Sequence, residues 1–596
     1  MAAEDLAAAT GTRITSTAED RQRPDAERRP EVPRLVWEQL PERVAQLARE
    51  RMPLLIEEDH SEWGVNLEAG EHPHILIEAD NYDALLALGA THRARIDIVF
   101  IDPPGSSPAI TLSTSHGEVS SFLYDGGYVN AEDPLRYRKW LSFMAPRLKL
   151  AWELLSARGV MVIQAGAPED TGHYRVLGDS LFGHQNFIAT LNVRMGAVGP
   201  RSSAAAAAGA IVNHTEHVLI WARNGRRELG VRPLYEAAPY DENYSIFLEP
   251  CAGEAGGYRE LKLIDVALGD AGLRAELERL GLLASGEPSI TDAYERSPRF
   301  RAFVHEHSER IVCEQGPSDE GADRVERPRL AEQIQPVSAA RPECRVARIR
   351  GDWWDGYHVD MRARAEALAG IEVEDPLTAR IARLGLLPLR LVRDLLRLLA
   401  PPDATVLDFF AGSGTTGHSL LALNAEEGAR RRAILVTNDE QNMCRTVAWA
   451  RMRQQLEGAP LRFFTCGTEG GGWLDCGDSP GPLADRSRAG AFDTVRVREG
   501  CFTPLVAEDG FVVYGGAGKL LGVLYDERSD EELLAAVRNI HSGEQEVAVY
   551  TLGGVRGLAE HVRVQPFGAQ ARVHNAQAEL LGSHRRSLEV LESAVG

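Results

Sequence analysis

A continuous apolar run over Ile98–Ile101 is followed directly by the turn Asp102-Pro103-Pro104. Four consecutive apolar residues are typical of a strand that is buried on both faces, as in a parallel sheet. Before this run, residues 73–97 contain a short apolar segment, an acidic turn and an amphipathic stretch of helical period. Strand, helix and strand in this order predict an α/β domain with a parallel sheet.

The same alternation occurs in three further segments. Residues 137–166 predict a long helix that ends at Gly159 and a strand over Val160–Gln164. Residues 386–424 predict an amphipathic helix, a strand, a glycine-rich turn and a second helix. Residues 432–456 then predict a strand, an acidic turn and a helix, so that the α/β pattern spans both halves of the chain.

Length and composition limit the class of protein. A chain of 596 residues is too long for one hydrophobic core, so we expect two or three units. The seven cysteines form no CxxC pair, which argues against a zinc site or a disulfide framework. Neither a signal peptide nor an apolar segment of membrane-spanning length is present, so we expect a soluble cytoplasmic protein without a metal.

The charge of the chain is unevenly distributed. The formal net charge of −22 argues against nucleic acid as a partner of the whole surface, because phosphates attract cations. Residues 134–232, however, contain 13 Lys+Arg and 6 Asp+Glu, and residues 380–397 contain five arginines and one acid. We expect nucleic acid, if it binds, to lie along these two basic segments.

A glycine-rich turn follows the strand of residues 404–408. Asp408 ends this strand, at the edge where open α/β sheets bind ligands. Gly412 and Gly414 allow a tight turn and the close approach of a ligand. The sequence contains a GxG pattern without a third glycine or a Walker lysine, so a dinucleotide or triphosphate loop is disfavoured. An acid before such a loop suits a cofactor with a cationic amino acid portion, such as S-adenosylmethionine.

Two further features complete this site. Thr415 or Thr416 is expected to cap the helix that follows the loop. About thirty residues further on, Asp439 and Glu440 follow the next strand, where an acid can accept hydrogen bonds from two ribose hydroxyls.

The Asp102-Pro103-Pro104 turn predicts a second site. The prolines restrict the backbone, so the Asp102 carboxylate and the proline carbonyl oxygens become fixed hydrogen-bond acceptors. Two such acceptors can orient an exocyclic amine for attack on an electrophilic methyl group and stabilise the positive charge that develops on nitrogen. No side-chain base is needed for this chemistry.

Taken together, five segments resemble the β-class adenine-specific DNA methyltransferases, including the modification subunits of type III restriction systems. These segments are "ILIEADNYDALLAL…IDIVFIDPP", "WLSFMAPRLKLAWELLSARGVMVI", "FIATLNV", "NHTEHVLIWARN" and "VLDFFAGSGTTGHSLLALN…ILVTNDEQ". The DPP segment precedes the glycine loop, which is the circularly permuted order of that class. The resemblance implies a Rossmann-like methyltransferase fold, S-adenosylmethionine as methyl donor, and methylation at N6 of an adenine flipped out of double-stranded DNA.

The resemblance also implies roles for individual residues. Asp102, Pro103 and Pro104 would be catalytic. The methionine part of the cofactor would lie against Asp408, Phe409, Ala411, Gly412, Gly414 and Thr415. Glu440, with Asp439 beside it, would hold the ribose, and Asp80 would lie near the adenine of the cofactor.

The domain organisation follows from the same comparison. We expect a disordered tail (1–30), a catalytic half (31–224), an inserted recognition-like region (225–375), a cofactor-binding half (376–468) and a small α+β accessory domain (475–596). The family further implies double-stranded DNA, a restriction or defence-system subunit and a second copy of the chain as partners.

One position departs from the family pattern. Gly105 stands where the family has an aromatic residue that stacks on the flipped base. Such stacking contributes about 1–3 kcal/mol per base, so its loss is expected to weaken base capture by about ten- to a hundredfold. Either another aromatic residue replaces it (Phe122, Tyr124 or Tyr128), or the chain is a catalytically impaired homologue that acts by binding DNA. A methyltransferase that acts on a non-DNA substrate is the third alternative.

Overall fold

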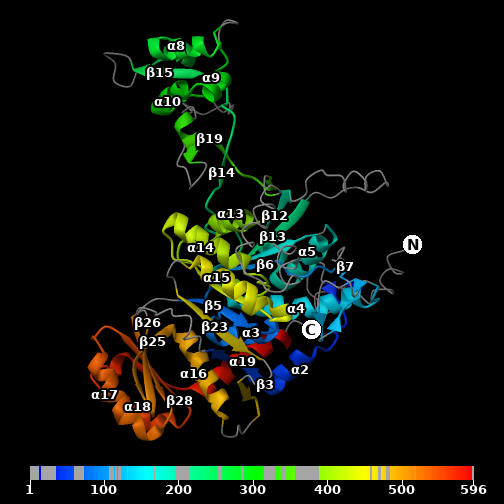
Figure 1. Cartoon of the computed structure of the whole chain (residues 1–596), viewed down its shortest axis with the longest axis vertical. Coiled ribbons are helices and arrows are strands. Elements are labelled where there is room, and N and C mark those ends of the chain that lie inside the picture. The colour runs from blue at the N-terminus through cyan, green and yellow to red at the C-terminus, as the bar shows by residue number, and fades with distance from the viewer. Residues whose placement is uncertain are drawn as a thin grey trace, which may run out of the picture. The chain divides into compact units, whose positions relative to one another are not determined.

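The structure of the chain is a computed structural model (Figure 1). It describes residues 13–14, 35–58, 73–106, 113–114, 117–118, 123–125, 127–130, 132–166, 168–194, 215–226, 229–250, 258–283, 288–314, 329–336, 344–355, 357, 388–456, 460–467, 472–477, 483–516 and 518–592. The predicted tail over residues 1–30 lies outside this set, apart from the backbone of residues 13–14. The chain divides into two compact units, Met1–Val231 with Asp352–Gly596, and Arg232–Gly351.

The first unit is built on a ten-stranded sheet. In order across the sheet the strands are β20 (Trp353–Trp354), β12 (Phe187–Arg194), β13 (Thr215–Ala222), β11 (Leu155–Ala165), β6 (Ile96–Ile101), β21 (Thr405–Asp408), β22 (Arg432–Thr437), β5 (His74–Glu78), β23 (Leu461–Cys466) and β4 (Leu55–Glu57). The six strands from β11 to β23 run parallel to one another. At the two ends of this parallel group, β13 is antiparallel to β11 and β4 is antiparallel to β23. The parallel α/β sheet expected from the sequence is therefore confirmed.

The order of the strands is not the order of the chain. β5 and β6 follow one another in sequence, but β21 and β22 lie between them in the sheet. Four of the six residues of β6 are almost fully buried apolar residues that run from Ile98 to Ile101, as the continuous apolar run predicted. This order puts the glycine-rich turn that follows β21 next to the Asp-Pro-Pro turn that follows β6.

Helices cover the sheet. They include α3 (Asn81–Thr91), α4 (Arg136–Leu154), α5 (Pro168–Phe182), α13 (Leu389–Leu399) and α14 (Thr415–Glu427). α3 packs on α4, and α13 packs on α14. The strongly amphipathic α13 buries Leu391, Leu395 and Leu399 on one face, as its helical period predicts. Among the residues that the structure describes, no helix combines the length and apolar character needed to cross a membrane.

The helix predicted to end at Gly159 ends earlier. α4 stops at Leu154, and β11 already begins at Leu155, which pairs with Ile96 of β6. A bulge then separates Leu155 from Val160. At Gly159 a Cβ atom would lie 2.9 Å from the Ile96 carbonyl oxygen, so glycine permits the close backbone approach at this bulge. Glycine therefore marks a bulge in the strand rather than the end of the helix.

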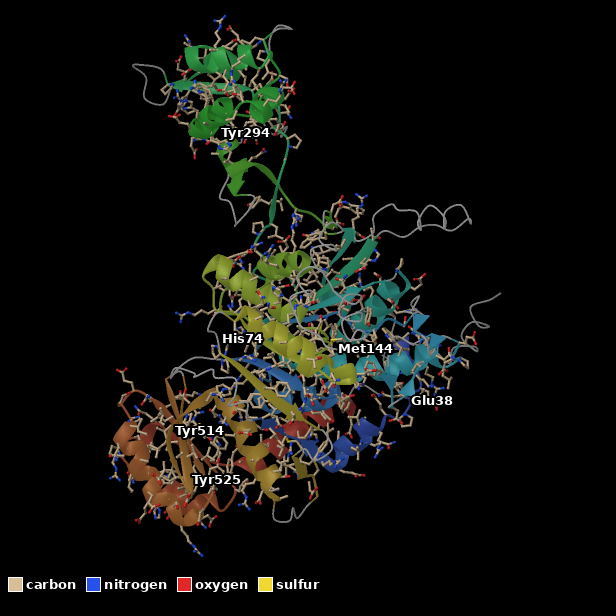
Figure 2. The ribbon with its side chains drawn as sticks, in the orientation of Figure 1. Glu38, His74, Met144, Tyr294, Tyr514 and Tyr525 are labelled. Carbon is tan, nitrogen blue, oxygen red and sulfur yellow. The ribbon has the colours of Figure 1, made fainter. Side chains whose placement is uncertain are left out.

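The C-terminal part has a sheet of its own (Figure 2 labels Tyr514 and Tyr525 in this region). Its strands are β25 (Cys501–Glu508), β26 (Phe511–Gly516), β27 (Lys519–Leu524), β28 (Glu546–Thr551) and β29 (Ala571–Asn575). The helices of this part are α16 (Asp485–Glu499), α17 (Asp530–Ile540), α18 (Val555–Arg563) and α19 (Ala576–Glu592). α16 packs on α3 and β4, and α19 packs on α3 and α4, so these two helices connect the small sheet to the large one.

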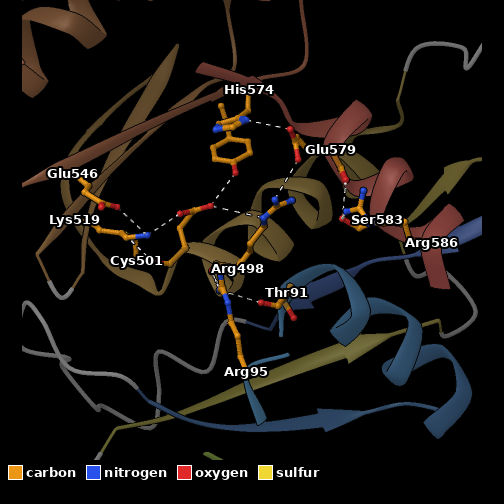
Figure 3. Close-up of polar contacts among 12 residues, drawn as sticks. Thr91, Arg95, Arg498, Cys501, Lys519, Glu546, His574, Glu579, Ser583 and Arg586 are labelled. Carbon is orange, nitrogen blue, oxygen red and sulfur yellow. Dashed lines mark hydrogen bonds and ion pairs between the residues drawn. The ribbon is translucent and has the colours of Figure 1, made fainter. Parts of the chain in front are cut away.

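Polar contacts reinforce this connection (Figure 3). Arg95, which follows α3, donates a hydrogen bond of 2.8 Å to the carbonyl oxygen of Arg498 in α16. Arg498 donates to Glu579 of α19 at 3.2 Å, and the hydroxyl of Tyr550 in β28 donates to Glu499 at 2.9 Å. The contacts thus link α3, α16, α19 and the small sheet in one network.

The described residues of the second unit form two three-stranded sheets and four short α-helices. The strands are β14 (Tyr235–Ala237), β19 (Cys344–Ile349) and β18 (Ile334–Pro336) in one sheet, and β16 (Tyr258–Lys262), β15 (Ile246–Pro250) and β17 (Ile311–Val312) in the other. The helices are α7 (Leu263–Leu268), α8 (Ala271–Arg279), α9 (Ile290–Arg296) and α10 (Pro298–Glu306). Tyr294 (Figure 2) lies in its core, with its hydroxyl 2.6 Å from Nε2 of His305. This unit falls within residues 225–375, and its predicted role in recognition stays a prediction.

Candidate functional site

Four acid-bearing turns lie at one edge of the large sheet. Asp102 follows β6, Asp408 ends β21, Asp439 follows β22 by two residues, and Asp80 follows β5 by two residues. The four strands are neighbours and run parallel, with Val406 paired to Ile98 where β21 meets β6. The carboxyl ends of parallel strands meet at the same edge, where open α/β sheets bind ligands. The structure therefore brings together the two sites predicted from separate parts of the sequence.

The loop after β21 has the conformation that its glycines allow. Gly412 and Gly414 have φ values of +48° and +78°, in the region that favours glycine. The amide of Ala411 donates to the carbonyl oxygen of Val436 in β22 at 3.0 Å, which fixes the loop against the neighbouring strand. A Cβ atom on Gly414 would lie 3.5 Å from Ala448, so the helix of the next crossover packs directly on the loop.

The prediction that Thr415 or Thr416 caps the following helix is wrong. The N-cap of α14 is Gly414, and no side chain caps the helix. The Thr416 hydroxyl instead donates a hydrogen bond of 2.6 Å to Oδ2 of Asp408. The cap is lost because the left-handed conformation of the loop places glycine, which has no side-chain acceptor, at the N-cap position.

The Asp408 carboxylate is almost fully buried beneath the loop. Its Oδ1 accepts a hydrogen bond of 3.0 Å from the amide of Phe410, and its Oδ2 accepts the bond from Thr416. Burial raises the pKa of Asp408 to about 7, against the opposing effect of these two hydrogen bonds. Asp408 thus shapes the loop from within, and it titrates near neutral pH.

A buried arginine, which the sequence analysis did not single out, also supports the loop. Arg451 lies in α15 (Trp449–Gln455) and is 4% exposed. It donates to the hydroxyl oxygens of Thr415 and Ser413, at 3.0 and 3.1 Å, and to Nδ1 of His418 at 3.1 Å. Its partners are more than thirty residues earlier in the chain. No local pattern in the sequence could have identified it.

The acids that follow β22 lie at the start of an irregular helix. In place of one continuous helix, the chain forms a 3₁₀ turn (Glu440–Asn442), a π-helical segment (Met443–Ala448) and α15. Oδ1 of Asp439 accepts a bond of 3.3 Å from the amide of Arg445. The Arg445 side chain makes two hydrogen bonds, of 2.5 and 2.9 Å, to the Glu78 carboxylate at the end of β5. Local π-helical structure is frequent at functional sites.

Asp80 caps the next helix at this edge. Its Oδ1 accepts the amide of Tyr82 at 2.8 Å, and Oδ1 also accepts Nη2 of Arg147 at 3.2 Å. The Asp80 side chain is 48% exposed, whereas the Arg147 side chain is fully buried. Burial lowers the pKa of Arg147, but the adjacent carboxylates, first Glu42 and then Asp80, outweigh burial and raise it. Arg147 therefore remains charged beneath the site.

The Asp-Pro-Pro turn is held by two buried aromatic side chains. The carbonyl oxygen of Pro104 accepts hydrogen bonds of 2.9 Å from Nε1 of Trp140 and 2.9 Å from the hydroxyl of Tyr174. These two bonds occupy both lone pairs of that oxygen. Within the described residues, no donor is recorded on the carbonyl of Pro103. The Pro104 carbonyl is therefore already used within the fold, and it is not one of the acceptors expected for a substrate amine.

The structure gives a steric reason for a glycine at position 105. A Cβ atom at this position would lie 2.1 Å from Oδ2 of Asp170, in the first turn of α5. Asp170 is buried, and its Oδ1 accepts a bond of 2.8 Å from the hydroxyl of Ser106. The same hydroxyl lies 2.6 Å from Nδ1 of His173. A carboxylate thus occupies the space into which a side chain at position 105 would begin to extend.

The structure describes the side chain of one of the three aromatic residues suggested as replacements, Tyr124. Phe122 and the side chain of Tyr128 lie outside the described residues. The Tyr124 hydroxyl donates to the carbonyl oxygens of Leu40 and Pro41, at 2.9 and 3.1 Å, so this ring is attached to the N-terminal segment. Their role toward a base stays a prediction.

The two basic segments carry less unpaired charge than their composition indicates. In α13, Arg393 and Arg397 make ion pairs of 2.6 Å with Glu426, and Arg397 also contacts Asp394 at 3.1 Å. In residues 134–232 several cations are likewise bound to acids, namely Arg138 to Glu38, Lys139 to Asp133, Arg158 to Asp97, Arg175 to Asp179, Arg194 to Asp355 and Arg223 to Glu153. Among the described residues of these two segments, many of the cations are therefore paired with acids of the chain, whereas Arg201, Arg227, Arg380 and Arg383 lie outside that set.

The site fits S-adenosylmethionine in the chemistry of its donors and acceptors. The cofactor presents an ammonium group, two ribose hydroxyls and an adenine amine, which all donate hydrogen bonds. Asp439, Glu440 and Asp80, none of which is buried, are acceptors after two neighbouring strands, whereas Asp408 lies beneath the loop with both oxygens already bonded. Gly412 and Gly414, which have left-handed backbone conformations and no side chains, leave the loop backbone accessible at the same edge. Within the described residues, no cluster of His, Cys, Asp or Glu is arranged to bind a metal ion.

Comparison with known proteins gives similarity to DNA methyltransferases of restriction-modification systems. Residues 385–446 match the model of a DNA methylase family. The chain is 26% identical over 369 residues to the type II methyltransferase M.KpnI of Klebsiella pneumoniae, covering 60% of this chain and 79% of the relative. It is 26% identical over 397 residues to the Mod subunit of the type III restriction-modification enzyme StyLTI of Salmonella typhimurium, covering 63% and 54%. The chain thus spans about half the length of that Mod subunit.

Solved structures that match the chain include TTHA0409 of Thermus thermophilus in complex with S-adenosyl-L-methionine and the cytosine-N4-specific PvuII DNA methyltransferase. TTHA0409 is 15% identical with a TM-score of 0.29, covering 65% of this chain and 99% of the other. The PvuII enzyme is 12% identical with a TM-score of 0.29, covering 66% and 98%. These scores are too low to add to the strand order described above.

Proposed function

We propose that this chain, a relative of the DNA methyltransferases of restriction-modification systems, transfers a methyl group from S-adenosylmethionine to N6 of a flipped adenine in double-stranded DNA. The observation that carries the proposal is the pairing of β21 with β6. It puts the glycine loop after Asp408 beside the Asp102-Pro103-Pro104 turn at one sheet edge. A donor held by the loop and an amine held by the turn would then be adjacent, as direct transfer requires.

The cofactor supplies an electrophilic methyl group bonded to a sulfonium, and the chain's residues hold the two partners. Gly412 and Gly414 let the loop backbone approach the amino acid portion, with Asp408 supporting the loop from below. Glu440 and Asp439 would accept the ribose hydroxyls, and Asp80 would accept the adenine amine.

The target amine is oriented by two acceptors. The Asp102 carboxylate and the Pro103 carbonyl would accept its two N–H bonds, which turns the nitrogen lone pair toward the methyl group. The positive charge that develops on nitrogen is stabilised by the same two oxygens. Trp140 and Tyr174 keep the turn rigid by bonding the Pro104 carbonyl, so that little reorganisation is needed during transfer.

The test is transfer of tritium from labelled S-adenosylmethionine to unmethylated genomic DNA by the full chain. Native protein is expected to label DNA, and Asp102→Ala is expected to lose the label while still binding cofactor in calorimetry. Digestion of the DNA to nucleosides must then give label in N6-methyladenine. Label in N4-methylcytosine would move the target to cytosine, and no label with intact cofactor binding would overturn the proposed activity.

Partners are part of this proposal. The likeness to type III Mod subunits supports DNA as substrate and a restriction-system subunit as partner. The unit Arg232–Gly351 is the proposed recognition element, although it contains 22 acidic and 16 basic residues. A homodimer and a cytoplasmic location stay predictions.

A further inference from the structure

A single buried side chain, Arg147 of α4, contacts two segments that are far from it in the sequence, at Glu42 and at Asp80–Asn81. Its Nη1 and Nη2 atoms bind both carboxylate oxygens of Glu42, at 2.9 and 2.7 Å. Nη2 also donates to Oδ1 of Asp80 at 3.2 Å, and Nε donates to Oδ1 of Asn81 at 2.5 Å. The planar guanidinium fork is suited to such simultaneous contacts, which a lysine could not reproduce.

The contact with Asp80 fixes the direction of its carboxylate. Both recorded donors, the amide of Tyr82 and the side chain of Arg147, bind Oδ1. Because the Asp80 side chain is still 48% exposed, the carboxylate is held on its inner side and presented to solvent on the other. In the proposed function this outer side is the acceptor for the adenine amine of the cofactor.

The contact with Asn81 extends to the glycine loop. The side-chain amide of Asn81 accepts from Arg147 through Oδ1 and donates through Nδ2 to the carbonyl oxygen of Phe409, at 3.2 Å. Arg147 thereby fixes which end of the amide faces the loop. The guanidinium also lies 3.8 Å from the centre of the Phe143 ring, and that ring lies 6.1 Å from the ring of Phe410. The loop is thus connected to Arg147 by a polar and an apolar route.

The contact with Glu42 attaches the N-terminal segment to the same arginine. Glu42 precedes α2 (Arg43–Glu50), and the residues before it are held on α4 and on the β9 strand (Leu123–Tyr124). The amide of Leu40 donates to the Ser142 hydroxyl at 3.0 Å, and the Tyr124 hydroxyl donates to the Leu40 carbonyl at 2.9 Å. Glu42 therefore neutralises Arg147 from a segment that is itself fixed in place.

We propose that Arg147 is the positioning residue of the cofactor site: it orients Asp80 directly and the Phe409 carbonyl through Asn81, and so sets cofactor affinity without touching the cofactor. The inference rests on the proposed function only in its assignment of the cofactor. It concerns binding, so it can be tested without methyl transfer.

The experiment is calorimetric titration of the full chain with S-adenosylmethionine, with thermal denaturation of the cofactor-free protein measured alongside. Arg147→Met is expected to weaken binding by about tenfold or more, and Arg147→Lys by less, because it keeps the charge but loses the fork. The matched control is Arg496→Met in α16. Arg496 is also buried and ion-paired, with Glu57 at 3.0 Å and Asp493 at 2.8 Å, but it lies away from the site. Its loss is expected to lower the melting temperature with cofactor affinity unchanged.

A double-mutant cycle separates positioning from general damage. Asp80→Asn keeps a helix cap and removes the charge, and alone it is expected to weaken binding by about tenfold. If Arg147 acts through Asp80, the dissociation constant of the double variant is expected to lie within about threefold of that of Arg147→Met. If the two residues act independently, the losses of affinity in the two single variants multiply in the double variant. Multiplication, or an equal loss of affinity in Arg496→Met, would overturn the inference.

If Arg147→Met does not fold, Asn81→Ala decides, because Asn81 is only partly buried. It is expected to fold and to weaken cofactor binding by about three- to tenfold, and native affinity would refute the link to the loop. A native chain that binds cofactor but does not label DNA would overturn the proposed function and leave this inference standing. A native chain that does not bind the cofactor would overturn both.

Discussion

Oδ2 of Asp170 lies 2.1 Å from the point where the Cβ atom of any other residue at Gly105 would have to be. The space beside Gly105 is therefore not an empty pocket from which only an aromatic ring is missing. The space is filled by a carboxylate that is itself bonded to Ser106. The Asp170 side chain therefore has to move before a larger residue can fit at position 105.

We predict that Gly105→Ala lowers the free energy of unfolding by about 1–3 kcal/mol, because the added methyl group overpacks a buried site. Gly166→Ala is the matched control, since nothing lies within 4 Å of its Cβ position. Asp170→Ala in the Gly105→Ala background should recover part of the loss. Chemical denaturation checks all three variants, and equal stability of the Gly105 and Gly166 variants would contradict the steric explanation.

The stability of the chain should depend on the protonation of Asp408. Its pKa is raised to about 7 in the folded state, so the folded state binds the proton more tightly than the unfolded state does. The stabilisation due to this proton is complete below the unfolded pKa near 4 and is lost as the pH rises through 7. The free energy of unfolding of Asp408→Asn minus that of the native chain should therefore increase from pH 4 to 7 and level off above.

Denaturation curves at several pH values measure this difference, which is of the order of a few kcal/mol at most. Thr416→Val provides the control, because it removes a hydrogen bond that favours the ionised carboxylate. In that variant the transition should move to higher pH. A pH-independent difference between Asp408→Asn and the native chain would show that Asp408 is ionised throughout.

Loss of either bond to the Pro104 carbonyl should affect transfer more than cofactor binding. Tyr174→Phe removes one donor, at a cost of about 0.5–1.5 kcal/mol in stability, and lets the Asp-Pro-Pro turn rotate. The turnover number is expected to fall several-fold, with the cofactor dissociation constant unchanged. Tyr550→Phe, in the C-terminal part, is the control for loss of a buried tyrosine hydroxyl, because Tyr550 is buried and donates to Glu499 at 2.9 Å. A fall in cofactor affinity would argue against this assignment.

The arginines of α13 are expected to contribute to packing rather than to DNA binding. Arg393→Gln and Arg397→Gln break ion pairs with Glu426, each worth about 0–1 kcal/mol at a partly exposed site. Affinity for DNA, measured by fluorescence anisotropy at fixed salt, should change by less than about twofold. A steep loss of affinity together with a reduced salt dependence would place phosphates on α13 after all.

The parts of the fold that follow from local patterns were predictable. The apolar run into Asp102, the strand into Asp408 and the amphipathic α13 all form as their periods indicate, because each pattern is satisfied by burial within one element. The helix boundary at Gly159 was wrong, since a glycine required by contact with Ile96 looks the same in sequence as one that ends a helix. The helix cap expected at Thr415 or Thr416 was also wrong, because the Thr416 hydroxyl donates its hydrogen bond to Asp408 and glycine occupies the N-cap position.

The supporting residues of the site could not be found from the sequence. Arg147 and Arg451 lie on helices whose patterns are ordinary, and the side chains to which they donate hydrogen bonds are between 33 and 105 residues away. Charge counting also misled, because an arginine-rich segment such as α13 carries no sign that its cations are paired with Glu426. Pairing across elements is a property of the assembled sheet and helices.

The position of β21 and β22 between β5 and β6 has a consequence for synthesis. A growing chain makes β5, β6 and β11 first, then the whole unit Arg232–Gly351, and only afterwards the two strands that belong in the middle. Until residue 437 has left the ribosome, β5 and β6 each keep an unfilled edge where the later strands will pair. Exposed edges invite wrong pairing, so a nascent chain halted between the two halves is the form of this protein most in need of a chaperone.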